Sequence, residues 1–154
     1  MLRKVDDFMK KKSYKTGYTA GVYDMFHIGH LNVIRNAKKH CKCLIVGVTT
    51  DEIVLKNKGK LPVIPFDERI EIVKSIRYVD KVIPQTDYSI DGKIKTAVEN
   101  KIDVMFVGSD WQNTDKWKTI EKELKRIGVD VIYLPHTDGI SSTILRKKIK
   151  GDLQ

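Results

Sequence analysis

Short apolar runs alternate with amphipathic segments along most of this chain. Residues 43–49 (CLIVGVT) and 104–108 (VMFVG) are continuous apolar runs, which are typical of strands buried on both faces of a parallel sheet. After residues 16–22, which are small and β-leaning, apolar residues recur at helical spacing from Leu31 to Ala37. The pattern predicts strands at 16–22, 43–49, 79–84, 104–108 and 129–134, and helices at 29–40, 65–76, 93–100, 117–127 and 141–149.

Local signals suggest where several helices begin or end. Asp67 is expected to cap the helix at 65–76, and Ser141 or Ser142 to cap the last one. Gly128 stands where a helix over 117–127 would end. Residues 51–61 (DEIVLKNKGKL) are polar and rich in lysine, so they are predicted to form a loop.

The regular alternation of strand and helix determines the expected fold class. It predicts a single-domain α/β protein with a doubly wound, Rossmann-like parallel sheet of about five strands and helices on both faces. Residues 16–150 would form this domain, and residues 1–15 a basic N-terminal extension. Ligands of such folds bind beyond the carboxyl ends of the strands. The polar segments that follow four of the strands are therefore expected to form one site: 21–30, 49–60, 108–117 and 136–143.

Composition narrows the class of protein. The 154 residues suffice for one ordinary domain, and 41% hydrophobic with 32% charged residues is a globular composition. No apolar run approaches the ~20 residues that a membrane span needs, so no stable membrane insertion is expected. The charged N-terminal segment lacks the apolar centre of a signal peptide, and a cytoplasmic protein is expected.

A formal net charge of +9 indicates polyanionic partners, which include nucleic acid, an anionic membrane and phosphorylated small molecules. The lysines are scattered over several predicted helices and do not interleave with aromatic residues, which argues against nucleic acid as a partner. A basic nucleic-acid-binding module stays open as an alternative. Cys41 and Cys43 would point to opposite faces of a strand, so they are expected to be reduced structural cysteines.

His27 and His30 flank Gly29 where the first predicted strand passes into a helix. They could cap the helix, bind a metal, act as acid–base catalysts beside a nucleophile, or bind the phosphates of a nucleotide. A metal site lacks an obvious third ligand, and no nucleophile motif accompanies the histidines. A helix N-terminus favours phosphate, Gly29 lets the backbone come close to it, and Gly21 keeps the strand end uncrowded.

Four segments resemble the cytidylyltransferase branch of the H-x-G-H nucleotidyltransferases. Residues 20–30 (AGVYDMFHIGH) resemble the H-x-G-H signature, and 140–146 (ISSTILR) resemble the second signature of that superfamily. Residues 77–82 (RYVDKV) resemble the R-Y-V-D element of the branch, and Lys58 resembles its phosphate-binding lysine. Within the branch, the chain is most similar to bacterial glycerol-3-phosphate cytidylyltransferases. It departs from them in having His136 where arginine is frequent, and in carrying additional residues before its first strand.

The resemblance implies a reaction in which CTP and an alcohol phosphate, expected to be sn-glycerol 3-phosphate, give CDP-glycerol and pyrophosphate. CDP-glycerol is a precursor of wall or capsule polymers. The resemblance also implies Mg²⁺ as a companion of CTP, and a homodimer. Phosphocholine or phosphoethanolamine as acceptor, and ATP as the nucleotide, stay open as alternatives.

The resemblance also assigns candidate roles, with no protein ligand to a metal. His27 and His30 would donate hydrogen bonds to the α- and β-phosphates, Lys58 would reach over the triphosphate, and Arg146 would hold its β- and γ-phosphates; these four are the candidate catalytic residues. Asp24 would hold a metal–phosphate assembly or orient a histidine. The candidate nucleotide-binding residues are Ala20, Gly21, Val22, Tyr23, Asp24, Gly29, Gly108, Asp110, Thr137, Gly139, Ile140, Ser141, Ser142 and Thr143. The candidate acceptor-binding residues are Arg77, Asp80 and Trp111.

Overall fold

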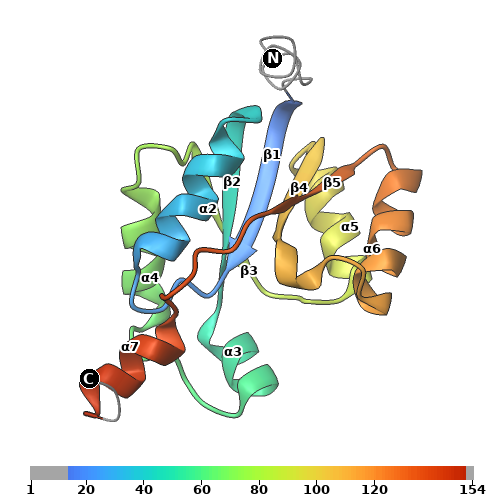
Figure 1. The fold of residues 1–154 in the computed structure, drawn as a ribbon. Helices are drawn as coiled ribbons and strands as arrows, with labels where there is room; N and C mark the ends of the chain where they lie inside the picture. Colours follow the sequence, from blue (N-terminus) through green and yellow to red (C-terminus); the bar gives the residue numbers. More distant parts are fainter. Residues whose placement is uncertain (1–13, 152–154) are drawn as a thin grey trace, which may run out of the picture.

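Five parallel strands form the centre of the molecule, in the order β3-β2-β1-β4-β5 (Figure 1). The computed structural model describes residues 14–151. The strands are β1 (Tyr14–Gly21), β2 (Cys41–Thr49), β3 (Lys81–Gln85), β4 (Val104–Gly108) and β5 (Asp130–Leu134). The strand order reverses between β1 and β4, so the switch point of this doubly wound sheet lies at the end of β1.

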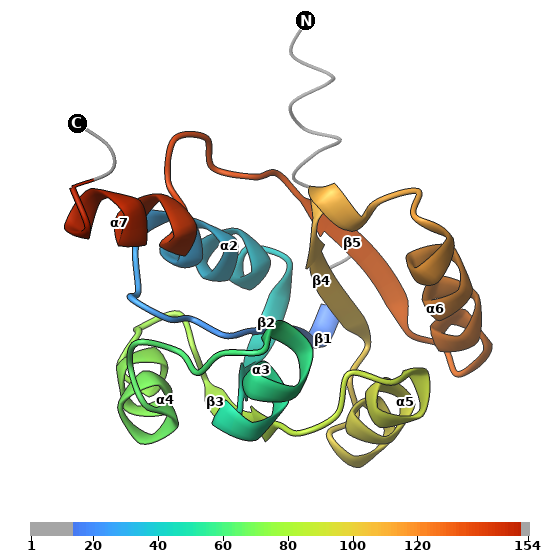
Figure 2. The same ribbon diagram turned by 90° about the horizontal axis from the view of Figure 1, so that it is seen from below.

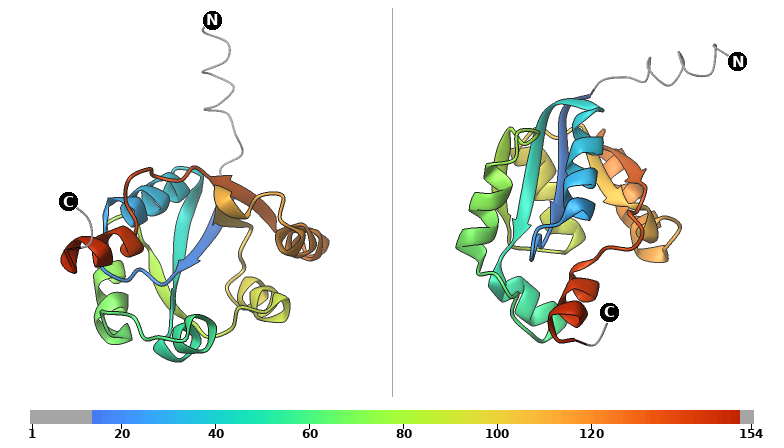
Figure 3. Two further views of the ribbon diagram at one scale, coloured as in Figure 1. Left: turned by 60° about the horizontal axis from the view of Figure 1, so that its bottom comes forward. Right: turned by 60° about the vertical axis from the view of Figure 1, so that its left-hand side comes forward.

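Helices cover both faces of the sheet, as the alternation of elements predicts. The pair α2 (Ile28–Lys38) and α4 (Phe66–Lys74) lies on one face, and α5 (Ile90–Glu99) and α6 (Asp115–Arg126) lie on the other (Figures 1 and 2). Two further helices, α3 (Asp51–Lys58) and α7 (Ser142–Ile149), lie at the edge where the strands end (Figure 3). A short 3-10 turn, η1 (Ser109–Trp111), follows β4. The predicted α/β fold class is confirmed.

Each face of the sheet has its own apolar core. Ile34 and Ala37 of α2 and Val73 of α4 pack on one face, together with alternate residues of β2, among them Leu44 and Val46. The other core combines Ile45 and Met105 of the sheet with Ala97, Ile120 and Leu124 from α5 and α6. Alternate side chains of a strand point to opposite faces, so continuous apolar runs arise where both faces are covered.

Two local predictions were wrong. Residues 51–58 form α3 rather than a loop, because Asp51 and Glu52 stand favourably at its N-terminus and Val54 packs inward. Gly59 ends this helix with a φ of 71°, a conformation that glycine adopts without strain. The N-cap of α4 is Pro65 rather than Asp67, which lies in the first turn.

The other predicted ends of helices and strands are confirmed or shift by a few residues. Ser141 caps α7, since its hydroxyl accepts a hydrogen bond from the Ile144 N–H at 3.1 Å. Gly128 follows α6 with a φ of 80°, as expected for a glycine at a helix end. Cys41 and Cys43 are free thiols, as predicted. β1 begins at Tyr14, within the predicted extension, and residues 1–13 lie outside the described part of the chain.

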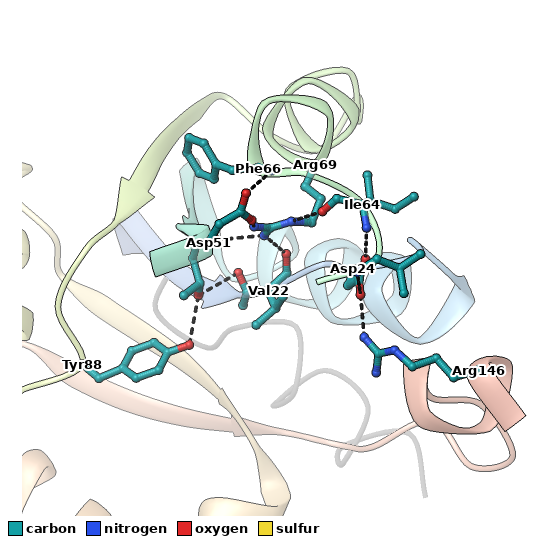
Figure 4. A network of polar contacts seen from close by, with 11 residues as sticks. Val22, Asp24, Asp51, Ile64, Phe66, Arg69, Tyr88 and Arg146 are labelled. Carbon is teal, nitrogen blue, oxygen red and sulfur yellow. Dashed lines mark hydrogen bonds and ion pairs between the residues drawn. The ribbon is translucent and has the colours of Figure 1, made fainter. Parts of the chain in front are cut away.

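A buried arginine joins the ends of β1 and β2 to the elements that follow them. The Arg69 side chain is fully buried, and one of its terminal nitrogens donates to the carbonyls of Val22 at 2.6 Å and Thr49 at 2.8 Å. Its other nitrogens donate to the carbonyl of Ile64 and the carboxylate of Asp51, at 2.9 and 2.6 Å (Figure 4). Arg69 therefore holds the first two strand ends, α3 and the α3–α4 connection together.

Replacing Arg69 by methionine is expected to lower the free energy of unfolding by about 3–5 kcal/mol. The substitution leaves three carbonyl acceptors and the half-buried carboxylate of Asp51 without their donor. Urea unfolding followed by circular dichroism measures the loss. Arg126→Met is the matched control, because Arg126 is exposed and pairs with Glu123 of its own helix; its effect should stay within ~0.5 kcal/mol. Equal effects of the two substitutions would contradict this role for Arg69.

Candidate active site

A cavity of about 720 Å³ opens at the carboxyl ends of the strands. It lies over the switch point between β1 and β4, at the edge that Figure 2 faces. Segments that follow β1, β2, β3 and β4 line it, together with the first turns of α7. The loops that the sequence places at one edge of the sheet therefore do converge on one hollow.

The charged side chains that line this cavity are predominantly positive. Its lining side chains include four lysines and one arginine: Lys58, Lys60, Lys93, Lys116 and Arg146. Among the lining residues that the structure describes, Asp24 is the one carboxylate, and it is already paired with Arg146. Such a cavity attracts a ligand that carries several negative charges.

The two histidines of the H-x-G-H segment form the N-terminus of α2. His27 is the N-cap, and its Nδ1 accepts a hydrogen bond from the Gly29 N–H at 3.0 Å. The Nδ1 of His30 accepts from the His27 N–H at 3.3 Å, and the two rings stack with their centroids 3.7 Å apart. With both Nδ1 atoms accepting, the neutral rings carry their protons on Nε2, which makes each Nε2–H a donor.

Gly29 makes this arrangement possible. A Cβ at residue 29 would stand 2.8 Å from the His27 ring and 3.3 Å from the side chain of Ile140. Any larger residue would therefore displace the capping imidazole. The contact also brings Ile140, in the segment before α7, against the start of α2.

Burial keeps both imidazoles neutral. It lowers the pKa of His27, and it lowers the pKa of His30 to about 4, with the neighbouring His27 adding to the shift and Asp24 opposing it. Two stacked rings cannot easily both carry a positive charge. Both Nδ1 lone pairs already accept hydrogen bonds, and a lowered pKa makes an imidazole a weak base. At neutral pH the pair therefore offers Nε2–H donors rather than a general base.

Asp24 connects three distant segments of the chain. Its buried carboxylate accepts hydrogen bonds from the N–H groups of Val63 and Ile64, both at 2.8 Å, and from Arg146 Nη2 at 2.5 Å (Figure 4). Its carbonyl accepts a hydrogen bond from the Ser142 hydroxyl at 2.7 Å. Burial alone would raise the pKa of Asp24, but these hydrogen bonds and the Arg146 charge outweigh it and hold the pKa below its ordinary value.

The turn that carries Asp24 is strained. Tyr23 and Met25 have positive φ angles of 56° and 49°, which side-chain-bearing residues rarely adopt. Tyr23 is buried, and its ring meets the edge of the His30 ring at a centroid distance of 5.3 Å. The surrounding contacts thus hold a tight turn that directs the Asp24 carboxylate inward.

Most of the residues that the sequence singles out reach this region. The candidates that line the cavity are Ala20, Gly21, Val22, Tyr23, Asp24, His30, Lys58, Gly108, Trp111, Ser142, Thr143 and Arg146. Of the remaining candidates in the last loop, Thr137 accepts a hydrogen bond from Asn32 of α2, Gly139 adopts a φ of 77°, and Ser141 is occupied as a cap. Asp110 lies 3.8 Å from His136, the residue that stands where arginine is frequent.

Two candidates for acceptor binding lie elsewhere. Asp80 stands just before β3, where its carboxylate accepts hydrogen bonds from Lys38 and from the Leu44 N–H. Arg77 rests on the ring of Tyr78, 5.0 Å from its centroid. Neither residue lines the cavity of this chain, so their predicted role stays a prediction.

The structure adds residues that the sequence analysis did not select. Gln85 lines the cavity from the end of β3, Tyr88 from the connection that follows, and Lys93 from α5. Lys116 and Trp117 line it from α6. No recognisable motif surrounds them. An apolar-periodic helix such as α5 gives no sign of which lysine turns toward a cavity.

Comparison with known proteins identifies the family. Residues 18–148 match the cytidylyltransferase-like protein family. The chain belongs to this family, and it is a nucleotidyltransferase. It is 34% identical over 133 residues to the glycerol-3-phosphate cytidylyltransferase of Bacillus subtilis, a match that covers 86% of this chain and 95% of that protein.

Two further relatives differ in the activity that their names state. The FAD synthase of Pyrococcus abyssi is 38% identical, over 75% of this chain and 77% of its own length. The ethanolamine-phosphate cytidylyltransferase of Arabidopsis thaliana is 34% identical, over 88% of this nucleotidyltransferase but only 32% of the plant protein. None of the helices described in residues 14–151 has the length and apolarity to cross a bilayer.

The pKa of His30 predicts how the stability of this family member depends on pH. Because the folded pKa is about 4 against an ordinary 6.5, the unfolded chain takes up a proton first as the pH falls between these values. The contribution of His30 is therefore complete above pH 6.5 and is lost toward pH 4. We expect a loss on the order of 1–2 kcal/mol between about pH 7 and pH 5.

Urea unfolding at both pH values measures this loss. His30→Asn should reduce it, whereas His136→Asn, at an exposed histidine, should leave it unchanged. A pH dependence that is the same in wild type and His30→Asn would disprove the assignment.

Proposed function

We propose that this nucleotidyltransferase transfers CMP from CTP to sn-glycerol 3-phosphate, giving CDP-glycerol and pyrophosphate. The observation that carries the proposal is the convergence of both signature segments, from opposite ends of the chain, on one cationic cavity. The match to a glycerol-3-phosphate cytidylyltransferase over nearly its whole length supports this choice of nucleotide and acceptor.

The reaction needs charge stabilisation more than it needs a base. The phosphate of the acceptor is an anion at neutral pH, so it can attack the α-phosphorus of CTP directly. Negative charge then grows on the α-phosphate and on the departing pyrophosphate. Neutral histidines that donate from Nε2 at the N-terminus of α2 suit this task, because they add to the field of the helix without needing a proton transfer.

The start of α7 would hold the β- and γ-phosphates. Ser142 and Thr143 line the cavity at this helix terminus. Arg146 makes one contact to Asp24 and has further N–H donors for phosphate oxygens. Lys58, the last residue of α3, would reach over the triphosphate from the other side.

The remaining roles are part of the same proposal. Gly108, Asp110, Thr137, Gly139 and Ile140 would surround the nucleoside, and Trp111 the acceptor. A homodimer and a cytoplasmic location are also proposed.

Mg²⁺ is proposed as a companion of CTP rather than as a resident of the protein. The Asp24 carboxylate is engaged by two backbone N–H groups and Arg146, so it does not fit the role of a metal ligand. Within residues 14–151, no cluster of histidine, cysteine and carboxylate side chains could hold a metal ion.

A pyrophosphate-release screen tests the function. CTP, ATP, GTP and UTP are each combined with glycerol 3-phosphate, phosphocholine or phosphoethanolamine. Release is expected with CTP and glycerol 3-phosphate. Release with ATP and not with CTP would refute CTP as the nucleotide. Release with only phosphocholine or phosphoethanolamine would refute glycerol 3-phosphate as the acceptor.

His27→Ala is expected to lower turnover by about 10²–10³-fold, the usual cost of removing one donor to a developing charge. Circular dichroism must show that the variant is folded, since the substitution also removes the N-cap of α2. Steady-state pyrophosphate release measures the effect. Turnover near that of the wild type would reject the phosphate role of His27.

A further inference from the structure

Lys93 of α5 lies between two aromatic rings at the wall of the cavity. Its Nζ is 5.9 Å from the centroid of the Tyr88 ring and 5.7 Å from that of Trp117. It also donates a hydrogen bond to the Tyr88 carbonyl at 3.0 Å, which holds the ammonium in this position. The side chain is half-buried, and it lines the cavity together with both rings.

The same wall carries a second ammonium group. Lys116 Nζ lies 5.9 Å from the centroid of the Trp111 ring. Three aromatic rings of the wall (Tyr88, Trp111 and Trp117) thus each have a lysine within cation–π distance. Burial, and next the charge of Lys116, lower the pKa of Lys93, so a further positive charge is already unfavourable here.

These positions are the ones that a ligand ammonium would need. Quaternary and primary ammonium ligands bind against aromatic faces, helped by nearby carboxylates. Here lysine ammonium groups lie by those faces, and Asp24, the carboxylate among the described lining residues, is bound to Arg146. A cationic acceptor would therefore meet repulsion, because the carboxylate that acts on Lys93, that of Asp87, lies outside the lining of this cavity and influences the Lys93 pKa less than Lys116 does.

The wall of α5 and α6 lies on the acceptor side of the reaction. This placement rests on the proposed function, in which the α2 and α7 N-termini hold the triphosphate. In-line transfer requires the acceptor to approach opposite the departing pyrophosphate. Figure 2 shows α5 and α6 on one side of the strand ends and α2 and α7 on the other. Residues of all four helices line the cavity.

We infer that Lys93 selects the acceptor: it admits alcohol phosphates whose alcohol part is a neutral polyol, and it excludes those that carry an ammonium group. An ammonium has three N–H donors, and one of those of Lys93 is used by the Tyr88 carbonyl. The others can bind acceptor hydroxyl or phosphate oxygens. Lys93 thus favours one class of acceptor by hydrogen bonding and rejects the other by charge.

The test compares wild type with Lys93→Met, which keeps the length of the side chain but removes its charge. The measured quantity is the ratio of kcat/KM for glycerol 3-phosphate to that for phosphocholine, from pyrophosphate release with CTP. We expect Lys93→Met to lower this ratio at least about tenfold, with a gain for phosphocholine as well as a loss for glycerol 3-phosphate. Lys93→Arg, which keeps the charge, should still reject phosphocholine, and Lys118→Met, on the exposed side of α6, should leave the ratio unchanged.

Isothermal titration calorimetry with phosphocholine and with glycerol 3-phosphate gives a second readout. Lys93→Met should bind phosphocholine more tightly than the wild type does. An unchanged ratio together with unchanged phosphocholine binding would overturn the role of Lys93 and leave the proposed function standing. If the wild type releases no pyrophosphate with any acceptor, the proposed function fails, and the calorimetric comparison alone decides whether Lys93 excludes cations.

Discussion

The site depends on one buried carboxylate, that of Asp24. Its hydrogen bonds to Val63, Ile64 and Arg146 connect the turn after β1, the segment before α4 and the last helix. Without this anchor, only packing and two neutral hydrogen bonds, from Ser142 to the Asp24 carbonyl and from Asn32 to Thr137, would join the part of the described chain around the H-x-G-H segment to the part around the serine–threonine segment. A buried carboxylate requires such partners, because an unpaired charge in a protein interior is very costly. The same need that stabilises Asp24 therefore brings the two signature segments together.

The electrostatics of the cavity follow a simple division. Among the lining residues that the structure describes, the one carboxylate is neutralised by Arg146 and the histidines are kept neutral by burial, so the lysines dominate the field. In the proposed function, polyanionic substrates are attracted over some distance, and the imidazoles would donate hydrogen bonds to them at short range. In a transfer between two phosphates, the attraction offsets the repulsion between the substrates.

In the proposed function, the two sides of the cavity have different roles. The N-termini of α2 and α7 supply backbone and side-chain donors suited to a triphosphate. The opposite wall, from α5 and α6, supplies lysines that lie against aromatic rings. Under the proposed function, substitutions on the second wall would change the acceptor and leave the reaction in place, because the two walls belong to different helices.

Much of this protein follows from its sequence. The apolar runs determine the parallel sheet, and the spacing of His27, Gly29 and His30 determines a helix N-terminus suited to phosphate, because both depend on neighbouring residues. Residues 51–58 were predicted to form a loop, but they form a polar helix that is stabilised by its ends and by the inward-facing Val54. Lys93 and Arg69 were missed altogether. Whether a lysine faces solvent or a cavity, and whether an arginine is buried, depends on contacts with residues remote in the chain, and only the tertiary structure decides those.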